Sequence, residues 1–169
     1  MVTVLALSGC GSSKKREASI AEMKRVQSAF GDLQIAVDAG VSQQEFSQRV
    51  NDMLVKIGDF RNSENLALLG LPKEQNKVQD IYAHFSRAAE AYKLSKEFFG
   101  DRWDPVGEEA TDFPSEEERE TVKTAFPDVF PSYGVTSRRD TLRDLWKLAS
   151  DETRSAKTLM DQLDSSSGN

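Results

Sequence analysis

The most reactive side chains of this chain are a single cysteine, Cys10, and a single histidine, His84. One cysteine can form neither an internal disulfide nor a cysteine cage for zinc or an iron–sulfur cluster. Serine–histidine catalysis needs a histidine beside its nucleophile, and the sequence has no Gly-x-Ser-x-Gly turn and no glycine-rich phosphate loop. We therefore expect a protein that is not an enzyme and carries no metal or other cofactor. His84 is then a polar residue on the flank of a helix.

Carboxylates gather in one stretch of the chain. They are Asp101, Asp104, Glu108, Glu109, Asp112, Glu116, Glu117, Glu118 and Glu120. A loop that brings several carboxylates together can bind calcium, but this spacing departs from the Asp-x-Asp-x-Asp-Gly pattern of an EF-hand. We expect a solvated acidic loop that leads into a charged helix start, and weak binding of a divalent cation is the alternative.

Aromatic residues flank the same stretch, where Trp103 stands near Phe98, Phe99 and Phe113. Such a group fits a plug that closes one end of a helical domain. It also fits the lining of a small apolar pocket or a protein contact. In the second case, the residues expected to touch the ligand or partner are Phe98, Trp103, Asp104 and Phe113.

The composition is typical of one acidic globular domain. The chain has 169 residues, 38% of them apolar, and 22 lysines and arginines against 28 acids, for a net charge of −6. This length supports a single hydrophobic core. A negative net charge argues against general nucleic-acid binding, because neutralising phosphates requires clustered cations. No apolar run approaches the length of a membrane-spanning helix.

Apolar residues recur at intervals of three and four along most of the chain, which predicts helices. The predicted helices cover about residues 17–39, a second stretch from Ser42 through Phe60, residues 73–99, a short helix that opens at Ser115 and stops before Pro127, and a last helix from Thr136 or Ser137 through Leu163. Gly40 suits the left-handed position after a helix. Ser42 to Glu45 and Ser115 to Glu118 both read as capping boxes.

The pattern predicts an all-α protein, because no strand-like alternation of useful length occurs. We expect an antiparallel bundle of about four long helices, since the link between the first two is very short. An irregular segment over about residues 100–135, with its short helix, precedes the last long helix. A single domain then spans residues 17–164, followed by a disordered tail over residues 165–169.

The amino terminus carries the most specific motif, Leu7-Ser8-Gly9-Cys10. It resembles the lipobox of bacterial lipoproteins, in which a branched apolar residue and two small residues precede a cysteine. The resemblance covers this terminus alone. It implies a diacylglyceryl group on the Cys10 sulfur, cleavage between Gly9 and Cys10, and acylation of the new amino terminus.

Residues 1–9 then form part of a lipoprotein signal peptide. A signal peptide begins with a basic region and an apolar core of about 7–15 residues. Only a short apolar stretch precedes the motif here, so we expect the true start to lie upstream of Met1. Residues 10–16, which include Lys14, Lys15 and Arg16, are expected to be a polar tether.

These features predict a lipid-anchored protein of the cell envelope. The residue after the cysteine is Gly11 rather than an aspartate. In the family that the motif resembles, this favours the outer membrane where a bacterium has one. We expect an interaction or structural module that contacts the membrane through Cys10 and an envelope protein through its helices. The alternative is a module that binds a small ligand or a divalent cation through residues 98–120.

Overall fold

The computed structural model describes residues 10–63, 71, 73–98, 114–128 and 137–166. Within these ranges the chain forms five α-helices and no strand, so the predicted all-α class is confirmed. The helices are α1 (Cys10–Ala39), α2 (Gln43–Asn62), α4 (Gln75–Ser95), α5 (Glu116–Ala125) and α6 (Arg138–Ser165).

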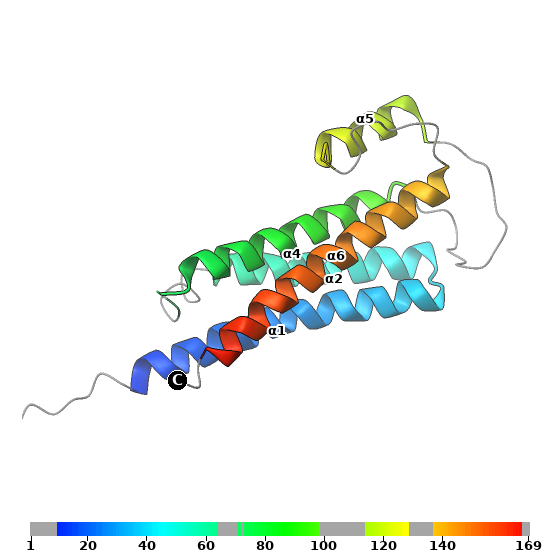
Figure 1. Ribbon diagram of the computed structural model, residues 1–169. Helices are drawn as coiled ribbons and strands as arrows, with labels where there is room; N and C mark the ends of the chain where they lie inside the picture. Colours follow the sequence, from blue (N-terminus) through cyan, green and yellow to red (C-terminus); the bar gives the residue numbers. More distant parts are fainter. Residues whose placement is uncertain (1–9, 64–70, 72, 99–113, 129–136, 167–169) are drawn as a thin grey trace, which may run out of the picture.

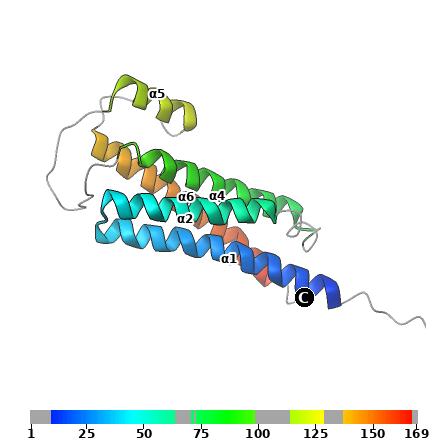
Figure 2. The same cartoon turned by 180° about the vertical axis from the view of Figure 1, so that it is seen from behind.

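The four long helices pack as the expected bundle. α1 lies against α2 and α6, and α4 lies against the same two helices, so each long helix has two neighbours. Figures 1 and 2 show α5 outside this bundle, on the side formed by α4 and α6. None of the helices that the structure describes is both long and apolar enough to cross a lipid bilayer.

Aromatic rings from four helices meet in the centre of the bundle. Phe30 stacks on Phe85 with ring centroids 5.5 Å apart, and Phe60 meets the same Phe85 edge-on at 6.4 Å. Phe46 lies 5.6 Å from Trp146, which is only 5% exposed. Such pairs add about 0.5–1.5 kcal/mol each beyond the burial of their area. The stripe of apolar residues that predicted the helices is therefore also the stripe that forms the core.

Short polar residues and one glycine fix the helix ends. Gly40 has a φ of 82°, the left-handed conformation that ends α1. Ser42 accepts a hydrogen bond from the backbone N–H of Glu45 at the start of α2. Ser115 and Glu118 form the predicted capping box at the start of α5. Ser137 caps α6 by accepting from the backbone N–H of Asp140.

Two helix boundaries differ from the sequence prediction. α1 begins at Cys10 rather than near residue 17, so the segment expected to be a polar tether is helical. Lys14, Lys15 and Arg16 are good helix formers, and Arg16 donates to the backbone oxygen of Leu163 near the end of α6 at 2.6 Å. This bond fixes the first turns of α1 to the bundle.

At the other boundary, α4 ends at Ser95 rather than at residue 99. The next three backbone N–H groups, from Lys96 to Phe98, donate to carbonyls three residues back instead of four. The helix therefore tightens into turns before it stops.

Candidate functional site

Most residues that the sequence singled out for contacts lie outside the described part of the chain. This applies to Trp103, Asp104, Phe113 and the predicted cleavage position Gly9. Phe98 is described, and it is buried in the core at 3% exposure. Cys10 is the first residue of α1. The contacts of the aromatic group and the cleavage before Cys10 therefore stay predictions.

His84 lies on α4, as expected, but it is not an isolated polar residue. Its Nδ1 is 2.5 Å from Oε2 of Glu152 on α6, across the seam between the two helices. The side chain of Glu152 is 15% exposed, so this contact lies at the edge of the core. It joins two helices that are far apart in the sequence.

Arg87, one helical turn after His84, extends the same cluster. Its Nε lies 2.9 Å from the second carboxylate oxygen of Glu152, and its Nη2 donates to Asp128 at 2.5 Å. Its guanidinium also stands 5.6 Å from the ring centre of Phe126. The hydrogen bond from Arg87 lowers the pKa of Asp128 below its usual value. Arg87 thus ties the segment after α5 to the α4–α6 seam.

Arg138, the first residue of α6, makes a similar attachment at the other end of α5. Its Nη2 donates to both carboxylate oxygens of Glu118, at 2.6 and 2.7 Å, and its Nη1 donates to the backbone oxygen of Glu97. Partial burial by itself would raise the pKa of Glu118. Hydrogen bonds from Ser115 and the charge of Arg138 outweigh that effect, so the pKa lies below its usual value.

The apolar contact between α5 and the bundle is narrow. Val122 is the buried residue of α5, and Phe126 at its carboxyl end is also buried, at 2% exposure. Both belong to the same core cluster as the long helices. Two buried apolar side chains therefore join α5 and its carboxyl end to the core, and two arginine–carboxylate pairs attach this segment to α4 and α6. We call this face of α4 and α6, with Arg87 and Arg138 at its two ends, the α5 seat.

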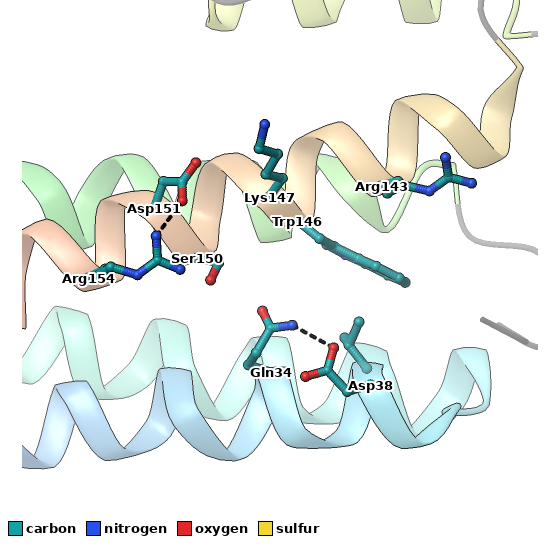
Figure 3. A pocket seen from close by; sticks show the side chains of 9 residues that line it. Gln34, Asp38, Arg143, Trp146, Lys147, Ser150, Asp151 and Arg154 are labelled. Atoms are coloured by element: carbon teal, nitrogen blue, oxygen red, sulfur yellow. Dashed lines mark hydrogen bonds and ion pairs between the residues drawn. The ribbon is translucent and has the colours of Figure 1, made fainter.

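A second feature is a groove of about 610 Å³ between α1 and α6. Figure 3 shows the ring of Trp146 and the hydroxyl of Ser150 directed toward α1, while the ammonium of Lys147 points away from it. The groove is lined by Gln34, Val37, Asp38, Arg143, Trp146, Lys147, Ser150, Asp151 and Arg154. Seven of these nine residues are polar or charged, and both signs of charge are present.

A hydrogen-bond chain links this groove to the core. The buried hydroxyl of Tyr92 donates to Gln34 at 2.7 Å, and the amide of Gln34 donates to Asp38 at 2.8 Å (Figure 3). Burial, and to a smaller extent the negative charge of Asp38, raise the pKa of Tyr92 far above its usual value. Tyr92 therefore stays a neutral donor at physiological pH, and it fixes the orientation of Gln34.

No known protein family, curated protein or solved structure matches this chain. Within the described ranges, no three histidine, cysteine, aspartate or glutamate side chains stand together as a metal site. In the His84 cluster, both oxygens of Glu152 are engaged by side chains of α4. These contacts hold helices and α5 in place, which is a structural task.

Sequence reasoning did not find Arg87, Arg138 and Glu152. His84 and Arg87 are three residues apart and so share a helix face, which is a usable signal. Glu152, however, follows His84 by 68 residues, and only the packing of α6 on α4 brings them together. No local spacing encodes that contact.

Proposed function

We propose that this chain is a lipid-anchored protein of a bacterial cell envelope whose helical bundle is an interaction or structural module rather than an enzyme. The observation that carries the proposal is the sequence Leu7-Ser8-Gly9-Cys10, placed directly before a helical domain that begins at Cys10. In such a protein, acyl chains on Cys10 hold the domain at a membrane, and its partner is another envelope protein.

The start of α1 supports this proposal. Lys14 and Lys15 are exposed within two turns of Cys10, where cations can approach anionic lipid headgroups. Arg16 instead faces the bundle and binds the end of α6. A single acyl chain gives only marginal membrane binding, whereas two or more anchor stably. The proposed diacylglyceryl group meets that requirement.

The test is mass spectrometry of protein expressed from its native locus, both intact and as amino-terminal peptides. We expect Cys10 to be the first residue and to carry a diacylglyceryl group, and we expect Cys10→Ala to remain in the soluble fraction. An unmodified chain that still begins at Met1 or Val2 would refute the lipid anchor.

A second candidate function is the binding of a small ligand, and the groove between α1 and α6 is the observation that favours it. Its volume lies within the usual range for ligand pockets of roughly 300–1,000 Å³. The ring of Trp146 beside it provides a fluorescent reporter. With Trp103→Phe as background, a compound that binds there should change the Trp146 emission.

Matched measurements separate groove binding from the alternative at residues 98–120. A Ser150→Phe variant fills the groove, so it should lose the response to a groove ligand. Calcium chloride added to the unchanged chain tests the acidic stretch by thermal shift. If a panel of envelope metabolites and calcium leaves both signals unchanged, the ligand-binding function fails.

A further inference from the structure

The sequence of α5 stabilises its own helix start. Ser115 and Glu118 close a capping box. Three glutamates occupy the first turn, where their negative charges interact favourably with the positive end of the helix dipole. Only one of its ten residues, Val122, is buried. Most short helices depend on tertiary packing for their stability. α5 instead combines a strong local start signal with little packing.

The two ion pairs that hold α5 differ in exposure, and the Arg138–Glu118 pair is the more buried, at 31% and 20%. The Arg87–Asp128 pair is substantially exposed, with side-chain exposures of 34% and 61%. Exposed ion pairs add little stability and weaken in salt. Segments with few buried apolar contacts open at lower free energy than the core does. α5 is therefore the described helix best placed to leave the bundle while the four long helices stay packed.

The α5 seat presents charged and apolar contacts in a fixed order. The guanidinium of Arg138 lies at one end, a contact for two apolar side chains follows, and the guanidinium of Arg87 lies at the other end. The bound segment meets it with Glu118, Val122, Phe126 and Asp128. Glu118 and Val122 are four residues apart and lie on one face of α5, and Phe126, four residues after Val122, directly follows the last residue of the helix.

We propose that the α5 seat is a docking site for an acidic amphipathic helix, and that α5 occupies this site in cis. The partner is a protein segment whose helix carries a glutamate and, four positions later, an apolar residue. The helix ends just before an aromatic residue four positions further on, and the turn that follows places an aspartate two positions beyond it. This inference rests on the proposed interaction function and names the partner's chemistry. Docking of such a helix displaces α5, so α5 acts as an autoinhibitory contact.

The test uses a fluorescein-labelled peptide of residues 114–128 and the full chain. Val122→Asp in the chain places a charge in the apolar contact and displaces its own α5, while Arg87 and Arg138 stay intact. We expect fluorescence anisotropy to show that this variant binds the peptide at least tenfold more tightly than the unchanged chain. A peptide that itself carries the Val122→Asp change should bind neither protein.

A charge exchange checks that the peptide binds in the α5 seat. Arg138→Glu, added to the Val122→Asp chain, should abolish binding of the normal peptide. A peptide with Glu118→Arg should restore it. Recovery by this matched pair requires direct contact between the two positions, since a general loss of folding would not be reversed by changing the peptide.

A second variant covers the case in which Val122→Asp does not fold. Glu118→Arg in the chain repels Arg138 without changing an apolar residue, and it should also admit the normal peptide. In the unchanged chain, hydrogen exchange of α5 amides should be at least tenfold faster than exchange in the centres of α4 and α6. Exchange of α5 together with the core, or equal peptide binding by the unchanged chain and the folded variants, would overturn the proposal.

The measurement is independent of the lipid anchor. Acylation of Cys10 takes no part in peptide binding, so a negative result here leaves the membrane attachment standing. Equally, an unmodified Cys10 in the mass-spectrometric test leaves the α5 seat unaffected. The two failures are therefore distinguishable.

Discussion

Arg138 and Glu118 form a two-pronged contact, in which one guanidinium nitrogen reaches both carboxylate oxygens at 2.6 and 2.7 Å. The same carboxylate accepts the backbone N–H of Ser115 at 2.6 Å. One side chain thus closes the capping box of α5 and attaches that helix to the first residue of α6. Glu118 therefore contributes both to the start of α5 and to its attachment to the bundle.

This double role predicts a selective effect of Glu118→Gln. Glutamine can still close a capping box, but it loses the charge that pairs with Arg138. We expect faster hydrogen exchange in α5 and a fall in Tm of less than about 4 °C, because a partly exposed ion pair contributes at most about 1 kcal/mol. Glu117→Gln, at an exposed neighbouring position, is the matched control. Equal exchange in the two variants would show that the pair with Arg138 does not hold α5.

Attachment of α5 should weaken in acid. The pKa values of Glu118 and Asp128 lie below their usual values of 4.5 and 3.8 in the folded chain. The unfolded or undocked state therefore binds protons more readily. The stabilisation of docked α5 by these two carboxylates is complete above about pH 5, and it is lost as pH falls through the lowered pKa values. Hydrogen exchange or NMR shifts of α5 between pH 6 and pH 2 would follow this change.

The matched control for the acid effect is the double variant Arg87→Gln with Arg138→Gln. It removes both cations that lower the two pKa values, so the acid dependence of α5 should become shallower. An unchanged profile in this variant would show that the acid effect arises elsewhere in the chain.

Tyr92 should make the fold sensitive to alkali. Its pKa is raised in the folded chain, while in the unfolded chain it ionises near 10.0. The contribution of Tyr92 to the free energy of unfolding is complete below about pH 10. It declines as pH rises further, because Tyr92 loses its proton at a lower pH in the unfolded chain than in the folded chain. Tyr92→Phe should cost about 0.5–1.5 kcal/mol at pH 7 through the lost hydrogen bond to Gln34.

Urea unfolding of both proteins between pH 7 and pH 11 provides the measurement. The difference in unfolding free energy between Tyr92→Phe and the unchanged chain should shrink above pH 10. If the unfolding free energies of the two proteins keep a constant difference up to pH 11, then Tyr92 does not cause the loss of stability in alkali.

Phe85 should be among the most sensitive core positions. It is fully buried and contacts the rings of Phe30 on α1 and Phe60 on α2. Phe85→Ala removes these contacts and leaves a cavity, so we expect a loss of about 3–5 kcal/mol in urea unfolding. Ile35→Ala, at an apolar position that is 68% exposed, should change stability by less than about 0.5 kcal/mol. Similar losses at the two positions would contradict this packing.

The sequence predicts the helices well because their signals are local. Ser137 precedes the last helix and Gly40 follows the first, and the structure confirms both ends. The start of the first helix was wrong, because Gly11, Ser12 and Ser13 have the composition of a tether while the lysines after them favour helix. The bond from Arg16 to α6 favours the helix, and it spans 147 residues.

The candidate sites were less predictable, because their members come from different helices. Tyr92 and Gln34 are 58 residues apart, and Arg87 and Asp128 are 41 apart. Side-chain type and helical spacing identify one face of each helix, but they do not say which faces meet. The pairing of Arg87 with Asp128 depends on how α5 returns to the bundle, which no local pattern encodes.

The unbroken course of α1 also sets a length. Thirty residues at a rise of about 1.5 Å give a rod of about 45 Å from Cys10 to Ala39. A group attached to the cysteine and the turn at Gly40 are thus held at a constant separation, with no hinge inside the rod. If the acyl chains proposed above are attached to Cys10, the turn at Gly40 lies no more than about 45 Å from them along the helix axis, and this length limits how far from a membrane that end of the bundle can reach.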